Sequence, residues 1–123
     1  MARRILVVED DLLNRMFYIA TLEQAGFDVD PVSDGALVMG EVALFAPDLV
    51  IMDINLPNVS GLELIERLKA DPAHRNLPIL AITAYVGKAE ESRIRQAGAS
   101  DYLAKPVSMK TFVGAIERLL PQL

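Results

Sequence analysis

Apolar residues along this chain fall into short uninterrupted runs that alternate with longer stretches of helical spacing. Three of the short runs are typical of strands covered on both faces, over residues 5–8, 49–53 and 79–82. A shorter run predicts a last strand over residues 101–104. Residues 27–32 alternate between apolar and polar and contain Pro31, which favours an exposed edge strand.

Helical spacing of apolar residues predicts five helices, each following one strand. Their expected bounds are residues 12–25, 36–45, 61–70, 88–97 and 109–120. Asp10 or Asp11 is expected to cap the first helix, and Gly26 to follow its end. Ser60 and Glu63 have the spacing of a capping box at the start of the third helix.

This alternation predicts the α/β class, with one doubly wound (βα)5 flavodoxin-like domain. The proline-bearing second strand belongs at an edge, and right-handed crossovers then favour a parallel sheet of order 2-1-3-4-5. Ligands of such sheets bind beyond the carboxyl ends of the strands, where the order reverses. Here that point lies between strands one and three.

Composition narrows the functional classes. The chain has 123 residues, of which 52% are hydrophobic, and a formal net charge of −5, so we expect one globular domain. The chain has no extended run of Lys and Arg residues, which argues against nucleic acid as a direct partner. No apolar run approaches the ~18 residues of a membrane span, and the apolar run after Arg4 is too short for a signal peptide. The absence of cysteine excludes disulfides. We expect a cytoplasmic protein without membrane insertion.

Polar residues follow four of the predicted strands and should meet at one edge of the sheet. They are Glu9 with Asp10, Asp53, Thr83 and Lys105. Two like charges ~4 Å apart repel by roughly 4 kcal/mol at an effective dielectric of 20, so such a cluster needs a cation. Carboxylate oxygens without histidine or cysteine suit Mg²⁺. We therefore predict a Mg²⁺ site that receives a phosphoryl group, with Asp53 as the acceptor.

Five pieces of sequence together resemble a response-regulator receiver domain. They are residues 8–10, residues 52–57, Gly61, residues 83–84 and residues 102–106. The resemblance covers the whole chain, residues 1–123, and implies a receiver with no output domain. It is most similar to stand-alone single-domain receivers of the DivK kind, which act in two-component signalling.

The resemblance implies how the acceptor site is built. Asp53 would take a phosphoryl group from a histidine kinase or a histidine phosphotransferase. Mg²⁺ would be held by Glu9, Asp10, Asp53 and the backbone carbonyl of Asn55. Lys105 would contact the phosphoryl group, and its bond to the following proline is expected to be cis. Such a domain is not an enzyme beyond its own phosphorylation and dephosphorylation.

The resemblance also implies a conformational switch. Thr83 would move to the phosphoryl group, and the ring of Tyr102 would turn inward. The face built from the fourth helix, the last strand and the last helix would then change shape. We expect a downstream protein target to bind that face.

Two other functional classes fit parts of this pattern. An aspartate-nucleophile phosphatase also uses a strand-end Asp with Mg²⁺, but it needs a second acid where this chain has Asn55. A flavodoxin-like FMN carrier needs a glycine- and hydroxyl-rich loop after the first strand. Here that loop is the acidic run of residues 9–11. Turnover of a phosphate ester, or a yellow chromophore, would distinguish these classes.

The first predicted helix carries more apolar residues than one buried stripe requires. Our hypothesis is that part of it docks on a helix bundle of the kinase or phosphotransferase. The residues expected to make this contact are Leu13, Met16 and Ala20.

Overall fold

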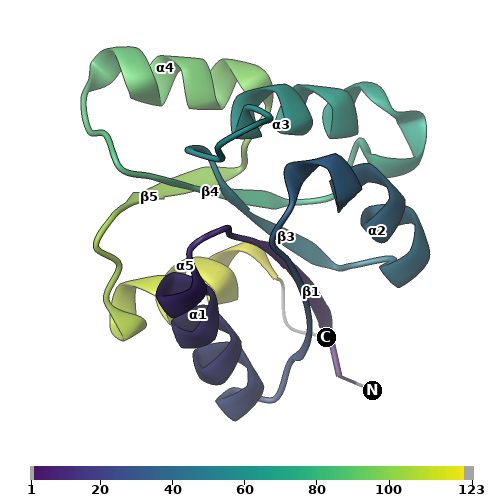
Figure 1. The fold of residues 1–123 in the computed structure, drawn as a ribbon, viewed down its shortest axis with the longest axis vertical. Helices are drawn as coiled ribbons and strands as arrows, with labels where there is room; N and C mark the ends of the chain where they lie inside the picture. The colour runs from purple at the N-terminus through teal and green to yellow at the C-terminus, as the bar shows by residue number, and fades with distance from the viewer. Residues whose placement is uncertain (1, 121–123) are drawn as a thin grey trace.

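The computed structural model describes residues 2–120, and its centre is a five-stranded parallel sheet (Figure 1). The strand order is β2-β1-β3-β4-β5, as predicted. The strands are β1 (Arg4–Val8), β2 (Asp28–Val32), β3 (Leu49–Asp53), β4 (Ile79–Thr83) and β5 (Asp101–Ala104). β3, which ends in the predicted acceptor, lies at the centre and is buried along its whole length.

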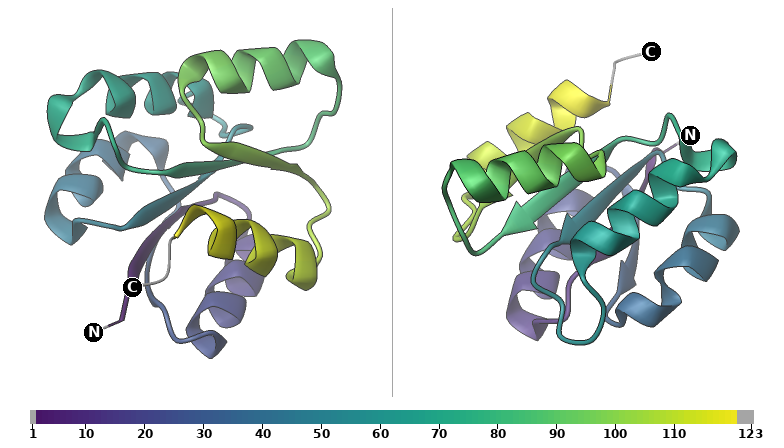
Figure 2. Two further views of the ribbon diagram at one scale, coloured as in Figure 1. Left: turned by 180° about the vertical axis from the view of Figure 1, so that it is seen from behind. Right: turned by 90° about the horizontal axis from the view of Figure 1, so that it is seen from above.

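Within residues 2–120, five α-helices cover the two faces of this sheet. α1 and α5 lie on one face, and α2, α3 and α4 lie on the other (Figures 1 and 2). Their bounds are α1 (Leu12–Gln24), α2 (Val38–Phe45), α3 (Gly61–Ala70), α4 (Lys88–Ala97) and α5 (Met109–Leu119). This confirms the doubly wound architecture. None of the helices in residues 2–120 has the length and apolar character needed to cross a membrane.

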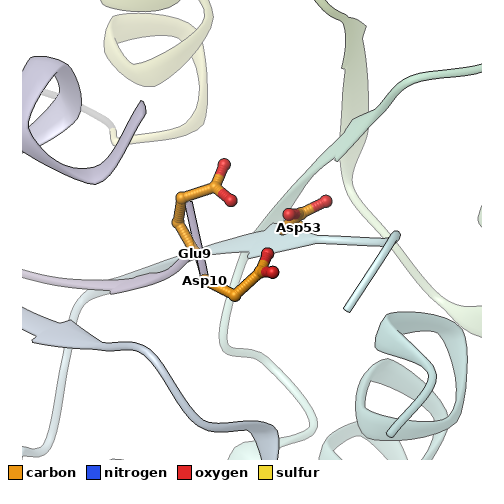
Figure 3. Close-up of side chains that lie close together, drawn as sticks. All are labelled: Glu9, Asp10 and Asp53. Atoms are coloured by element: carbon orange, nitrogen blue, oxygen red, sulfur yellow. The ribbon is translucent and has the colours of Figure 1, made fainter. Parts of the chain in front are cut away.

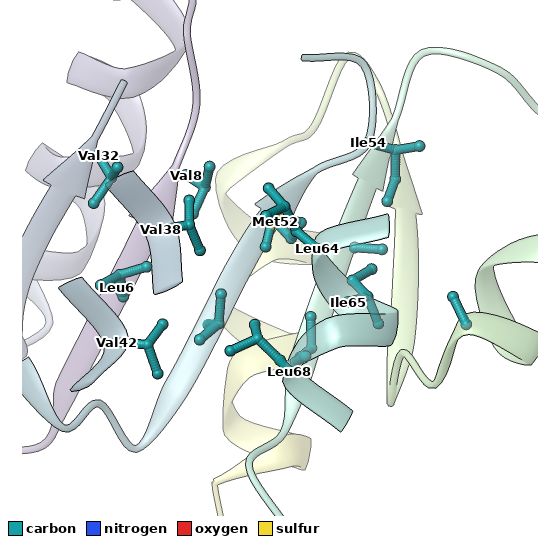
Figure 4. Packing of buried hydrophobic residues seen from close by; sticks show 14 of the residues in the cluster. Leu6, Val8, Val32, Val38, Val42, Met52, Ile54, Leu64, Ile65 and Leu68 are labelled. Carbon is teal, nitrogen blue, oxygen red and sulfur yellow. The ribbon is translucent and has the colours of Figure 1, made fainter. Parts of the chain in front are cut away.

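Alternate residues of the buried strands supply two hydrophobic clusters, one on each face. Strand residues such as Leu6 and Met52 pack against α2 and α3, as Figure 4 shows. On the other face, Ile51 packs with side chains of α1 and α5, where the rings of Tyr18 and Phe112 stack with centroids 4.9 Å apart. Because both faces are covered, the strand ends remain the place where polar groups reach solvent.

Two local predictions need correction. The helix expected over residues 36–45 begins as a 3-10 turn over Gly35–Leu37, and its α-helical part starts at Val38. Ser60 does occupy the N-cap of α3, but its side chain makes no capping hydrogen bond, so the predicted capping box is wrong.

Contact with the end of β3 fixes the start of α3 instead. The N–H of Gly61 donates to the carbonyl oxygen of Ile54 over 3.3 Å. A Cβ atom on Gly61 would lie 2.7 Å from the Ile54 Cα atom and closer still to the carbonyl oxygen of Asp53. Glycine is therefore required for α3 to begin directly against the strand that carries Asp53.

Candidate functional site

Three carboxyl groups meet at the carboxyl ends of β1 and β3. The two strands are neighbours, with Val8 opposite Met52. Glu9 and Asp10 directly follow β1, and Asp53 is the last residue of β3. Each side chain offers an oxygen within 4.8 Å of those of the other two, and Figure 3 shows the three groups gathered together. The predicted acidic cluster is therefore formed by the fold.

Two of these carboxylates are buried, and one of them is incompletely hydrogen-bonded. Glu9 is 0% exposed and Asp53 is 2% exposed, whereas Asp10 is exposed. Asp53 Oδ1 accepts the N–H of Asn55 (2.9 Å), and Glu9 Oε2 accepts the N–H of Asp11 (3.1 Å). Glu9 Oε1 is buried and accepts no hydrogen bond from the described part of the chain. A buried carboxylate oxygen without a hydrogen-bond donor indicates a position for a cation.

Lys105 follows β5 and brings one positive charge to the cluster. Its Nζ lies 3.2 Å from Asp53 Oδ2 and 3.4 Å from Glu9 Oε1. Only the contact with Asp53 is a hydrogen bond; the contact with Glu9 is an ion pair without hydrogen-bond geometry. One ammonium group therefore faces three carboxyl groups, and the cluster keeps an excess of negative charge.

The surroundings change the pKa values of both Glu9 and Lys105. Burial, followed by the nearby Asp53 carboxyl group, raises the pKa of Glu9 to about 7. Burial by itself would lower the pKa of Lys105, but the charges of Asp53 and Glu9 outweigh it, so that pKa is raised. The cluster thus holds its lysine charged and favours a proton on Glu9, as expected where negative charge is in excess.

The donor set fits Mg²⁺. It consists of carboxylate oxygens from Glu9, Asp10 and Asp53, and it includes the buried Glu9 Oε1 that has no hydrogen-bond donor. Hard oxygen ligands of this kind, with one exposed member that leaves room for water, suit a cation that retains part of its hydration. The backbone carbonyl of Asn55, the fourth predicted ligand, remains a prediction.

Thr83 ends β4 beside β3, but its hydroxyl is engaged away from the acidic cluster. Its Oγ1 donates to Glu90 Oε2 on α4 over 3.2 Å and accepts the N–H of Tyr85 over 3.1 Å. Thr83 is completely buried, and Glu90 is 8% exposed. Nothing in the sequence pattern singles out Glu90, because it lies in a polar helix seven residues after Thr83.

Tyr102 lies on the edge strand β5 and is half-buried. Its ring packs against the cluster of hydrophobic residues under α3 and α4, and Arg95 of α4 lies 5.5 Å from the ring centroid. The pKa of the Tyr102 hydroxyl is raised, first by burial and then by the charge of Glu91. The ring of Tyr102 is thus held by contacts with α4.

Several contacts at the cluster were not foreseen from sequence. Asn55 Oδ1 accepts the N–H of Ala84 over 2.8 Å, which ties the loop after β3 to the loop after β4. Arg15 Nη1 donates to the backbone carbonyls of Glu9 (3.0 Å) and Asp10 (3.1 Å).

Asp11 caps α1 by accepting the N–H of Asn14 (2.8 Å), as predicted for one of the two candidate caps.

The expected cis peptide bond before the last helix is present between Lys105 and Pro106.

A cleft beside the cluster reaches from Lys105 to α1. Its lining residues are Asn14, Phe17, Tyr18, Ala84, Lys105, Pro106 and Val107. The cleft thus gives access to Lys105 between α1 and the loops that follow β4 and β5.

Comparison with known proteins gives concordant results from sequence and structure. The model of the response regulator receiver domain family matches residues 5–117. A polar-differentiation response regulator DivK of Brucella anthropi is 37% identical over 120 residues, which cover 98% of each chain. The corresponding DivK of Brucella suis has the same identity and coverage.

Solved structures give the same fold. The chemotaxis protein CheY4 of Vibrio cholerae superposes with a TM-score of 0.92 at 25% identity, covering 98% of this chain and 100% of that one. A CheY-like response regulator receiver domain protein of Methanospirillum hungatei gives a TM-score of 0.90 at 25% identity, covering 98% and 94%.

Proposed function

Because this chain belongs to the response regulator receiver domain family, we propose that it is a cytoplasmic signalling protein phosphorylated on Asp53. The donor is a phosphohistidine of a histidine kinase or a histidine phosphotransferase. Receiver domains are signalling domains that bind Mg²⁺ in an acidic pocket, and their chemistry is limited to their own phosphorylation and dephosphorylation. Signalling then proceeds through phosphorylation-dependent protein binding or through relay of the phosphoryl group.

The observation that carries the proposal is the setting of Asp53. It is a buried carboxylate at the end of the central strand, 3.2 Å from Lys105 Nζ and beside a cluster that fits a divalent cation. An Asp53 carboxylate oxygen attacks the phosphorus atom, a P–O bond forms as the P–N bond breaks, and the imidazole of the donor leaves. When bound, Mg²⁺ supplies positive charge for the phosphoryl oxygens, which is most of what this transfer requires.

The other site residues act on the transferred group. Lys105 pairs with Asp53 before transfer and with a phosphoryl oxygen afterwards. Its raised pKa keeps the ammonium group positively charged for both contacts. Glu9 and Asp10 hold the metal together with Asp53 and the Asn55 carbonyl. Thr83 donates its hydroxyl to the phosphoryl group in the phosphorylated state.

The chemistry of the site argues against the two alternative classes. Asn55 provides its backbone N–H to Asp53 and its side-chain oxygen to Ala84, so it is committed to the loop and offers no acid for ester hydrolysis. The acidic cluster repels the phosphate of a flavin nucleotide unless a cation intervenes.

A test is incubation with Mg²⁺ and a small acyl phosphate, followed by a phosphate-dependent mobility shift. We expect a shifted band for the natural protein, none for Asp53→Asn, and none in chelator. Asp28→Asn, at the opposite end of the sheet, is the matched control and should shift normally. A shifted band that persists in Asp53→Asn would overturn the assignment.

Partner recognition is proposed to use the outer surface of α1. Leu13 is 75% exposed and Met16 is 56% exposed, next to the cleft that leads to Lys105. An exposed apolar strip beside the acceptor suits the apolar face of a helix in a donor protein. The downstream target is proposed to bind the face formed by α4, β5 and α5.

The donor surface has its own test. Met16→Glu should slow transfer from a phosphohistidine protein by about tenfold, equal to about 1.4 kcal/mol, and should leave transfer from a small acyl phosphate unchanged. Leu44→Glu, an equally drastic change at an exposed position of α2, is the control. Equal slowing with both donors would show damage to the site in place of lost docking.

A further inference from the structure

The hydroxyl of Thr83 is already committed to an acceptor inside the protein. It donates to Glu90 Oε2 over 3.2 Å, and both residues are buried. The other oxygen of the same carboxylate, Oε1, accepts a hydrogen bond from Arg93 over 3.0 Å. Both carboxylate oxygens of Glu90 therefore accept a hydrogen bond, in contrast to Glu9 Oε1, which accepts none from the described residues.

A threonine hydroxyl has one proton to donate, and both an ionised carboxylate and a phosphoryl oxygen are acceptors. Thr83 can therefore serve Glu90 or a phosphoryl group on Asp53, but not both. We propose that Glu90 is a latch that holds Thr83 in the unphosphorylated arrangement and sets how readily the switch responds. This inference rests on the proposed function, because it concerns the competitor for the same hydroxyl.

The position of Glu90 connects the latch to α4. Glu90 lies in the first turn of α4, and the helix begins after Gly87 with no side-chain cap. Only Glu90, Ile94 and Ala97 are buried among the residues of this helix. Release of Thr83 therefore removes a buried hydrogen bond near the start of α4, while the apolar contacts farther along the helix remain.

Arg93 determines what happens to Glu90 after release. Its side chain is 65% exposed and already paired with Oε1, so the carboxylate keeps a partner when the threonine departs. The freed Oε2 can take up water at the solvent-facing start of the helix. The latch can therefore open without leaving an unpaired buried charge, which makes it reversible.

Beryllofluoride with Mg²⁺ serves as a phosphoryl analogue that binds without covalent chemistry. The apparent dissociation constant is measured by titration calorimetry at saturating Mg²⁺. Glu90→Ala should lower it by about tenfold, since a hydrogen bond to a charged group no longer opposes the switch. Glu90→Gln, which retains an acceptor oxygen without the charge, should give a smaller decrease.

The control substitution is Glu66→Gln, at an exposed position of α3 away from Thr83, and should leave the dissociation constant unchanged. A double-mutant cycle removes structural explanations. In a Thr83→Ala background the Glu90→Ala change should have no effect, because the hydroxyl that the two acceptors share is gone.

The outcomes separate the two levels of inference. If the natural protein does not bind the analogue, the proposed function fails. If it binds, but Glu90→Ala leaves affinity unchanged or weakens it while the variant retains a cooperative thermal transition, the latch is refuted. Equal effects of Glu90→Ala with and without Thr83 refute it as well. Should Glu90→Ala fail to fold, the smaller Glu90→Gln shift and its loss in the Thr83→Ala background carry the same decision.

Discussion

Two partly buried polar clusters lie at neighbouring strand ends, and they differ in how completely their buried oxygens are hydrogen-bonded. The acceptor cluster, composed of Glu9, Asp10, Asp53 and Lys105, contains a buried oxygen with no hydrogen-bond donor and more negative than positive charge. In the latch cluster, composed of Thr83, Glu90 and Arg93, each carboxylate oxygen of Glu90 accepts a hydrogen bond.

This difference indicates which cluster is expected to be stabilised by binding a ligand. An unsatisfied cluster gains stability when a cation and a phosphoryl group arrive, whereas a satisfied cluster must lose a hydrogen bond to change. In a two-state switch, the ligand can shift the equilibrium only by its differential affinity for the two states. On the proposed mechanism, binding of a cation and a phosphoryl group at the first cluster would provide the free energy that opens the second.

The largest expected effect concerns the pH dependence of stability in chelator. The pKa of Glu9 is raised to about 7 in the folded protein from 4.5, so between these values the folded state holds a proton that the unfolded state releases. The free energy of unfolding should therefore fall by about 3 kcal/mol as pH rises from 5 to 8.

Denaturant melts across this range measure the effect. Glu9→Gln should remove most of the pH dependence, and Glu63→Gln, on the exposed side of α3, should retain it. Stability that rises with pH across the window specifically through Glu9 would contradict the description of the acceptor cluster as over-acidic.

Removal of the lysine should expose the imbalance of the acceptor cluster. Lys105→Ala leaves Asp53 and Glu9 without their cation, and we expect a loss of about 2 kcal/mol, below the range for fully buried pairs because the lysine is partly exposed. Mg²⁺ should restore part of the loss. Lys110→Ala, exposed at the start of α5, is the matched control in thermal melts. A loss that Mg²⁺ does not reduce would weaken the case for a metal site.

Removal of an acid should have the opposite sign. In chelator, Asp53→Asn relieves repulsion with Glu9 and Asp10, while Lys105 keeps Glu9 as a partner 3.4 Å away. We expect the free energy of unfolding to increase by about 1 kcal/mol, and the stabilisation by Mg²⁺ to shrink. A lower melting temperature for this variant in chelator would count against the carboxylate cluster.

The smallest effect is expected outside the acceptor cluster. Arg95 lies over the ring of Tyr102 at 5.5 Å and also pairs with Glu91 over 3.2 Å at the surface. A cation–π contact at an exposed site contributes about 0.5 kcal/mol, and a surface ion pair adds little to this. Arg95→Gln should lower stability by about this amount, with the same difference in chelator and in Mg²⁺. A difference that depends on Mg²⁺ would show that the two regions are coupled before phosphorylation.

Most of the fold was predictable from sequence because the apolar runs of β1, β3 and β4 are short and alternate with helical patterns, which is typical of a parallel sheet covered on both faces. The order of the strands then brought Glu9, Asp10, Asp53 and Lys105 together without knowledge of coordinates. The start of α3 was not predictable in detail, since Ser60 has the right spacing for a capping box and the close contact of Gly61 with β3 decides the geometry.

The partners of Thr83 were not predictable for a related reason. A sequence places Thr83 at a strand end, but the rotamer of its side chain depends on what the neighbouring helix presents. Glu90 is one of several acids in a polar helix, and nothing in the spacing distinguishes it from Glu91, which pairs with Arg95 at the surface. Long-range side-chain pairing depends on tertiary packing, which local patterns do not encode.

The most direct test of the account is a two-step titration followed by amide signals in NMR spectra. Mg²⁺ alone should shift the amides of Asp11 and Asn55, which donate to Glu9 and Asp53, and leave Glu90 and Arg93 unchanged. Beryllofluoride added afterwards should shift Glu90 and Arg93 together with Tyr85, whose amide donates to Thr83. Shifts at the acceptor cluster in both steps without any change at Glu90 would contradict the exchange between the two clusters.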